Sequence, residues 1–116
     1  YRSGHSRGST IDLTLVPLPV PYQPEFKPGD TLYDCTANEP SMRFKDNSID
    51  MGTGFDCFSE KSHTASTLVT TEQANNRQLL KTMMEFNGFV NYEYEWWHYR
   101  LRDEPFPNTY FDFEVL

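Results

Sequence analysis

The chain has 116 residues, of which 37% are hydrophobic and 16% aromatic, and it carries a formal net charge of −7 at pH 7. This length supports one domain with a modest core, and the aromatic content argues against disorder. An acidic chain without a basic stripe is unsuited to nucleic-acid binding. No apolar run reaches the length of a membrane span, so membrane insertion is not expected.

Hydrophobic and polar residues alternate over residues 9–16, which predicts a strand with one buried face. The hydrophobic positions are Ile11, Leu13 and Leu15. Asp12 falls on the polar face, His5 lies on the loop before the strand, and Gly8 lets the backbone turn between them. On this stretch alone, a surface histidine before an ordinary strand is an equally good interpretation.

Residues 17–48 are rich in proline and turn-forming residues, which excludes a central strand. We interpret them as one ordered surface loop, an insertion that shapes the rim of a site, and the alternative is a flexible flap without function.

Cys35 and Cys57 are the two cysteines of the chain. They are too few for a zinc finger, and either stay free or form a disulfide that ties this loop to the segment near Asp56. Such a link favours an oxidising location slightly.

The clearest helix is predicted over residues 71–86. Thr70 or Thr71 can cap its first turn, Glu72 favours its positive end, and Gly88 ends it. A stripe of apolar residues at helical spacing is expected to enter the core: Ala74, Leu79, Leu80, Met83, Met84 and Phe86. Extended structure is expected at 89–94 and a firm strand at 96–101, and the aromatic tail 106–116 is expected to pack on the sheet.

Glu95 and His98 complete a set of metal-binding residue types. Together with His5 and Asp12 they offer two imidazoles, one ligating carboxylate and one spare carboxylate, which is the inventory of a catalytic zinc site. Residues three apart on a strand point to opposite faces. Glu95 and His98 can therefore approach one metal only if Glu95 lies in the turn before the strand. His63 would block the open position of such a site, so we expect it to be structural.

These residues follow the spacing of a known family. The pattern S-x-H-x-x-G-x-x-x-D falls on Ser3, His5, Gly8 and Asp12, and E-x-x-H falls on Glu95 and His98. The chain resembles the D-alanyl-D-alanine dipeptidases, zinc enzymes known from vancomycin resistance. They form a branch of a group with D,D- and L,D-carboxypeptidases and the hedgehog signalling domain. The run Glu95-Trp96-Trp97-His98-Tyr99 resembles the dipeptidase branch in particular.

The resemblance implies an α+β fold of the hedgehog and D,D-peptidase type, with a small mixed or antiparallel sheet and flanking helices. It implies one Zn²⁺ per chain, held by His5, Asp12 and His98, and a metal-activated water with Glu95 as general base. The implied reaction is hydrolysis of D-Ala-D-Ala to D-Ala. Ser3 is implied to contact the substrate near its carboxylate, and Asp56 its ammonium group, although a turn-capping role for Asp56 is the alternative.

The resemblance also implies that residues 1–116 form the C-terminal part of a single catalytic domain, which lacks its N-terminal portion. That portion is then a required partner and carries the family's transition-state arginine, a role that we assign to neither Arg2 nor Arg7. Two other functions stay open: a carboxypeptidase or endopeptidase acting on peptidoglycan stem peptides, and a non-catalytic zinc-binding module of the hedgehog type. A bacterial periplasm or cell envelope is favoured slightly over the cytoplasm.

Overall fold

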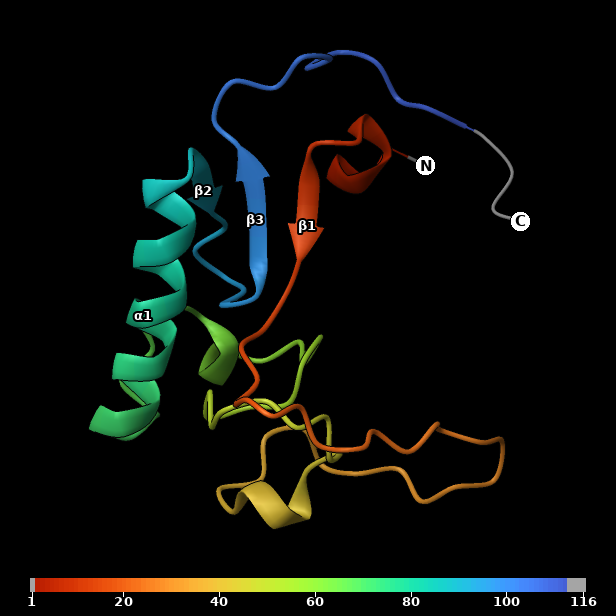
Figure 1. Cartoon of the computed structure of the whole chain (residues 1–116), viewed down its shortest axis with the longest axis vertical. Coiled ribbons are helices and arrows are strands. Elements are labelled where there is room, and N and C mark those ends of the chain that lie inside the picture. The colour runs from red at the N-terminus through yellow and green to blue at the C-terminus, as the bar shows by residue number, and fades with distance from the viewer. Residues whose placement is uncertain (1, 113–116) are drawn as a thin grey trace.

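The computed structural model describes residues 2–112 and shows an α+β chain (Figure 1). One α-helix, three strands and three short 3-10 helices make up the regular structure of the described residues. They are η1 (Gly4–Arg7), β1 (Thr10–Asp12), η2 (Pro40–Met42), η3 (Glu60–Ser62), α1 (Thr71–Phe86), β2 (Phe89–Asn91) and β3 (His98–Leu101). The expected α+β class and antiparallel sheet are therefore present, but a single α-helix flanks the sheet in this part of the chain.

Strand β3 is the centre of the sheet and pairs antiparallel with β1 on one side and β2 on the other. Both β1 and β3 are shorter than the predicted strands. Trp96 and Trp97 form a turn before β3. Beyond Asp12 the chain leaves the sheet: Leu13 still donates to the Trp97 carbonyl at 3.0 Å, but the Leu15 carbonyl accepts from Ile49 instead. The residues of the alternating pattern therefore bond to two different parts of the chain: those up to Leu13 to the sheet, and Leu15 to the loop that contains Ile49.

The prediction that Ile11 is buried was wrong, because 46% of this residue is exposed. Ile11 pairs with Tyr99, which is fully buried on the central strand. Helix α1 contacts β2, and Figure 1 shows it on the far side of the sheet from β1. Ile11 and Tyr99 lie on the same face of the sheet. This face is covered where Tyr99 lies, on the central strand, and it is open to solvent where Ile11 lies, on the edge strand β1.

Helix α1 has the predicted bounds, Thr71–Phe86. The Thr70 hydroxyl accepts from the Gln73 backbone, and the Gln73 side chain accepts in return from the Thr70 backbone, which forms a capping box. At the other end Asn87 is the C-cap, and Gly88 follows with a φ of 85°. This left-handed conformation favours glycine and turns the chain into β2.

The predicted apolar stripe of the helix was largely wrong. Leu80 is buried and Met84 packs against the core, but Leu79, Met83 and Phe86 are exposed, Phe86 by 90%. The buried face instead carries Gln73 and Arg77 beside Leu80. The helix packs against loops whose carbonyl groups need hydrogen-bond donors, so a polar stripe at i, i+4 is buried there.

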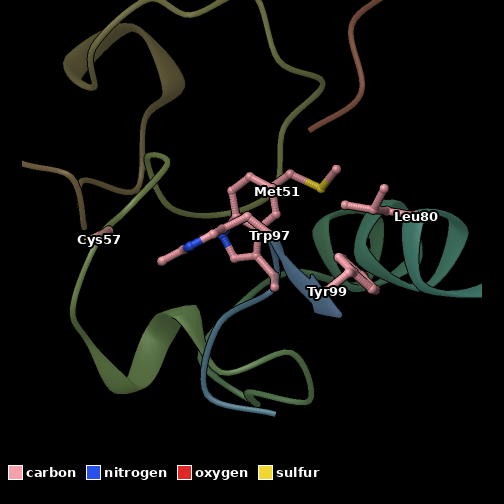
Figure 2. Close-up of a cluster of buried hydrophobic side chains, with 6 residues drawn as sticks. Met51, Cys57, Leu80, Trp97 and Tyr99 are labelled. Atoms are coloured by element: carbon pink, nitrogen blue, oxygen red, sulfur yellow. The ribbon is translucent and has the colours of Figure 1, made fainter. Parts of the chain in front are cut away.

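The core lies between α1, the sheet and the loop that contains Met51 (Figure 2). Its fully buried apolar residues are Met51, Cys57, Leu80, Trp96, Trp97 and Tyr99. The two tryptophan rings meet edge to face with centroids 5.2 Å apart, and the Trp96 indole donates to the Thr53 hydroxyl at 2.8 Å. The turn before β3 is therefore anchored by its own large side chains.

The described part of the predicted aromatic tail, residues 106–112, packs against η1. The Phe111 backbone donates to the Ser6 carbonyl at 2.8 Å, and the guanidinium groups of Arg2 and Arg7 lie over the Tyr110 ring. Residues 113–116 of the predicted tail lie outside the described residues. Within residues 2–112, no helix combines the length and apolar character needed to cross a bilayer.

Candidate metal centre

The pairing of β1 with β3 brings Asp12 and His98 together, because these residues stand directly opposite each other in the antiparallel register. Side chains of such a pair share one face and are separated by about 5 Å at their Cβ atoms. Asp12 is the last residue of β1 and His98 the first of β3. Their side chains meet, with Oδ1 of Asp12 3.0 Å from Nδ1 of His98.

His5 reaches the same point from the 3-10 helix η1. The Ser3 hydroxyl caps this helix by accepting from the His5 backbone at 3.3 Å, and Gly8 ends it with a φ of 75°, as the predicted turn requires. Nε2 of His5 lies 3.4 Å from Oδ2 of Asp12, and the His5 and His98 rings meet edge to face at 4.9 Å. The two motifs at opposite ends of the sequence thus form one cluster.

Glu104 holds η1 in place, a role that sequence analysis missed. Its carboxylate accepts from Arg7 Nε and from the Ser9 hydroxyl, both at 2.8 Å. The hydrogen bonds from Arg7 and then Ser9 lower the pKa of Glu104 below its usual range. Arg7 is therefore engaged in a structural ion pair, and no local pattern could show a contact between residues 97 positions apart.

The donor atoms of His5, Asp12 and His98 fit a divalent metal ion. They all lie within 4.8 Å of one another. Oδ1 of Asp12 is buried and has no hydrogen-bond partner, although Nδ1 of His98 is only 3.0 Å away, so the two atoms are not aligned as donor and acceptor. Imidazole nitrogen and carboxylate oxygen are ligands that zinc prefers, and three protein ligands leave a fourth position open.

Glu95 lies beside this cluster, in the turn before β3. Its Oε2 atom is 3.3 Å from Nδ1 of His98, and its side chain is 19% exposed. Burial raises the pKa of the Glu95 carboxyl above its usual value; His98 opposes this rise, while the charges of Asp12 and Asp56 add to it. The arrangement is a partly buried carboxylate of increased basicity next to a candidate metal site.

Asn91 fixes the turn that carries Glu95 and His98, and sequence analysis missed it as well. Its Nδ2 atom donates to the carbonyls of Glu95 and His98, each at 3.1 Å, and its Oδ1 atom accepts from the Thr64 hydroxyl at 2.7 Å. Asparagine is common in turns for many reasons, so its presence four residues before Glu95 gave no distinct signal.

The other predicted site residues lie around the cluster. Asp56 has a left-handed φ of 56° and an exposed side chain, and its charge acts on Glu95. Ser3 uses its hydroxyl as the cap of η1. His63 packs edge-on against Tyr94, with ring centroids 4.9 Å apart, and is not among the clustered donors.

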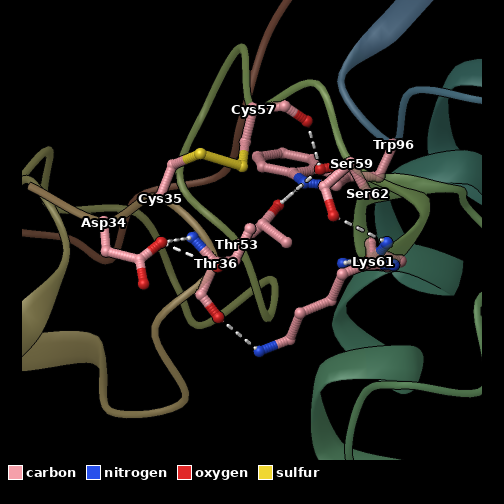
Figure 3. Close-up of a disulfide and its surroundings, with 10 residues drawn as sticks. Asp34, Cys35, Thr36, Thr53, Cys57, Ser59, Lys61, Ser62 and Trp96 are labelled. Carbon is pink, nitrogen blue, oxygen red and sulfur yellow. Dashed lines mark hydrogen bonds between the residues drawn. A yellow bond between two sulfur atoms is a disulfide. The ribbon is translucent and has the colours of Figure 1, made fainter.

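A disulfide joins Cys35 to Cys57, 22 positions apart, and ties the segment 17–48 to the residues around Asp56 (Figure 3). The Lys61 ammonium group strengthens this junction by donating to the Thr36 carbonyl at 2.8 Å and to the Asn38 side chain at 2.9 Å. Asp56 precedes one of the linked cysteines, so its backbone position depends directly on this junction.

A His–Asp–His cluster beside a partly buried glutamate, carried by a small antiparallel sheet, is the kind of site that zinc hydrolases use. The sequence profile of the D-Ala-D-Ala dipeptidase family, peptidase group M15, matches residues 31–116. The chain belongs to this family. The matched range includes Glu95 and His98, whereas His5 and Asp12 precede it.

Individual relatives match nearly the whole chain. The D-alanyl-D-alanine dipeptidase of Enterococcus faecium is 42% identical over 98% of this chain and 44% of its own length. The enzymes of the same name from Enterococcus faecalis and Streptomyces coelicolor are 40% and 39% identical, with the same coverage. The chain therefore spans less than half the length of the curated relatives that it matches.

Proposed function

We propose that this chain supplies the metal ligands and the general base of a zinc-dependent dipeptidase that hydrolyses D-Ala-D-Ala to D-Ala. The observation that carries the proposal is the convergence of His5, Asp12 and His98 on one point, with Glu95 beside them, in a member of this family. The names of the relatives support the substrate.

The three clustered side chains would hold one Zn²⁺ ion. Zinc, when bound, supplies a Lewis acid that lowers the pKa of water and polarises a carbonyl group. Glu95 then accepts a proton at a carboxylate oxygen from the water that attacks the peptide carbonyl carbon. It passes this proton to the nitrogen of the leaving amine as the C–N bond breaks. Burial raises the pKa of the Glu95 carboxyl, which makes its carboxylate a better proton acceptor.

Asp56 and Ser3 are proposed to orient the dipeptide. The exposed carboxylate of Asp56 suits the substrate's free ammonium group by charge. The Ser3 hydroxyl accepts from the His5 backbone and keeps its own proton free to donate toward the substrate carboxylate. We also propose a location in the bacterial cell envelope, which the disulfide between Cys35 and Cys57 supports.

Metal analysis tests the ligand assignment. Single replacements of His5, Asp12 and His98 by alanine should each remove zinc from the purified protein of full native length. His63→Ala is the matched control, because this histidine lies outside the cluster, and it should keep its zinc. Full occupancy in all three ligand variants would refute the proposed centre.

Substrate comparison tests the reaction. Released D-Ala should be measured with D-Ala-D-Ala and with N-acylated tripeptides and stem pentapeptides that end in D-Ala-D-Ala. A dipeptidase requires the free ammonium group and should ignore the longer peptides. Preference for the longer peptides would identify a carboxypeptidase instead, and zinc binding without any hydrolysis would identify a non-catalytic module.

A further inference from the structure

A cavity of about 760 Å³ lies beside Asp56, and the segment 17–48 forms much of its wall. We refer to it as the aromatic cavity, and its lining includes Thr14, Phe26, Tyr33, Phe44, Asp46 and Asp56, together with Leu32 and Phe55. The Phe44 ring meets those of Phe26 and Tyr33 edge to face, with centroids 6.4 and 6.2 Å apart. The three rings therefore support one another as a formed wall.

The chain leads directly from the candidate metal centre to the aromatic cavity. Asp56, the proposed partner of the substrate ammonium group, is part of the cavity lining. Thr14 lines the cavity two positions beyond Asp12, and alternate residues of an extended segment share a face. A row of side-chain oxygens without hydrogen-bond partners runs along this face, formed by Thr10, Asp12 and Thr14.

The lining combines aromatic rings with two carboxylates. Within residues 2–112, neither Asp46 nor Asp56 takes part in an ion pair, and Asp46 accepts only a backbone hydrogen bond from Ser48 at 2.9 Å. Aromatic faces and carboxylates both attract cations. An apolar occupant would strip water from two unpaired charges, which is unfavourable, and an anion would be repelled. The methyl group of alanine would leave most of the volume empty.

We propose that the aromatic cavity receives a long basic side chain on the first residue of a dipeptide substrate. Phe26, Tyr33 and Phe44 surround its aliphatic stem, and Asp46 binds its terminal ammonium group. Asp56 remains the partner of the α-ammonium group, so the inference rests on the proposed function. The substrate class is a dipeptide such as D-Lys-D-Ala.

Three dipeptides test this assignment with the protein of full native length: D-Lys-D-Ala, D-norleucyl-D-Ala and D-Ala-D-Ala. Norleucine keeps the aliphatic stem of lysine and lacks the ammonium group. Because hydrogen bonds to charged groups contribute about 1.5–3 kcal/mol, kcat/KM should favour lysine over norleucine about tenfold or more. Equal values for the two would overturn the proposal and leave the dipeptidase function intact.

Asp46→Asn should bring the ratio of lysine to norleucine close to one. Asparagine keeps the oxygen that accepts from Ser48, so the loop conformation is preserved. Glu39→Gln is the matched control: it removes one negative charge from the same segment without touching the cavity, and it should keep the wild-type ratio. A ratio unchanged in Asp46→Asn would refute the role of this carboxylate and overturn the proposal.

Calorimetric binding measurements distinguish a failure of the cavity assignment from a failure of the proposed dipeptidase function. The two long-chain dipeptides are titrated into Glu95→Gln protein, in which turnover is expected to be slow. One outcome is that the lysine peptide binds about tenfold more tightly than the norleucine peptide while the wild-type protein hydrolyses none of the three dipeptides. That combination would support the assignment of the cavity and reject the dipeptidase function. Equal binding of both peptides would reject the cavity whether or not hydrolysis is seen.

Discussion

Glu95 lies beside the three candidate ligands, with Oε2 3.3 Å from Nδ1 of His98. Charge explains why it is assigned as a base and not as a fourth ligand. Two imidazoles and one carboxylate would leave a bound Zn²⁺ with a single net positive charge, so it would remain a strong Lewis acid. A second ligating carboxylate would neutralise the centre and fill its open position.

Glu95→Gln should therefore keep its zinc and lose at least about a hundredfold in kcat, the lower end of what general-base catalysis contributes. Glutamine retains the shape of the side chain and removes its basicity. Zinc content and D-Ala release, measured on the same preparation, check both parts. Loss of zinc would make Glu95 a ligand, and full activity would point to another base.

Asp50 links stability to pH. Burial alone would raise its pKa, but hydrogen bonds from Gln73, Arg43 and the Gly52 backbone together outweigh burial and lower the pKa below its usual value. A carboxylate with a depressed folded pKa stabilises the fold at any pH above its unfolded value of about 4. This stabilisation is lost as the pH falls through the folded pKa.

Urea unfolding should be measured between pH 6 and pH 2. The free energy of unfolding of the wild-type protein should fall below about pH 4, and the fall should be smaller in Asp50→Asn. Asparagine cannot titrate, so the Asp50→Asn variant should be less stable than the wild type at pH 6, and its free energy of unfolding should change less as the pH falls. Asp103→Asn serves as the control, because it removes the same charge from an exposed position. Parallel curves for wild type and Asp50→Asn would contradict the assignment.

The clustering of His5, Asp12, Glu95 and His98 was predictable, because their residue types and spacing form two short motifs. Asn91 and Glu104 were not predictable. Glu104 acts through contacts with residues more than 90 positions away, and Asn91 through hydrogen bonds to backbone carbonyls, which no residue pattern encodes.

At the scale of elements, local signals predicted the bounds of the helix, whereas the strand bounds and the buried faces depend on long-range contacts. The capping box and Gly88 determine where α1 starts and ends, and both are readable in sequence. The register that sets Asp12 opposite His98 is a choice between strands more than 80 positions apart, which alternation alone does not specify. The buried face of α1 was mispredicted because the hydrophobic pattern of a helix does not show which loop carbonyl groups require hydrogen-bond donors from it.

Arg77 is the residue behind that misprediction. It is fully buried, and its guanidinium group donates to the carbonyls of Met51, Lys61 and His63 at 2.6–2.9 Å. Burial lowers its pKa to about 10, so it stays protonated at neutral pH. One side chain on the helix thus fixes the two loops that surround the core.

Arg77→Met should lower the free energy of unfolding by at least about 3 kcal/mol, because it leaves three carbonyl groups without their donor. Methionine is unbranched and fills similar space, so a cavity contributes little. Denaturation in urea measures the change. Gln78→Met, on the exposed face of the same helix, is the control and should change stability by less than about 0.5 kcal/mol. Equal effects would show that the three hydrogen bonds contribute little.

At the scale of the whole molecule, the chain divides into a regular part and an irregular part. The regular part consists of the sheet, α1 and η1, and its strands and η1 carry the candidate ligands (Figure 1). The irregular part is the segment 17–48, which forms much of the aromatic cavity. Its prolines predicted its irregular backbone, but the cavity depends on how Phe26, Tyr33 and Phe44 meet, which composition does not determine. The disulfide and the Lys61 ammonium group link this segment to the residues 57–61, which precede α1 (Figure 3).

Replacing Cys35 and Cys57 by serine should separate the two parts functionally. A disulfide that closes a loop of this length is expected to contribute about 3 kcal/mol by restricting the unfolded chain, so the unfolding temperature should fall. Zinc content should persist, because the strand pairing and η1 hold the ligands at residues 5, 12 and 98, outside the closed loop. The preference for D-Lys-D-Ala should fall, since Phe44, Asp46 and Asp56 all lie between the linked positions. If zinc were lost along with that preference, the irregular segment would be part of the metal scaffold, and the division between scaffold and cavity would fail.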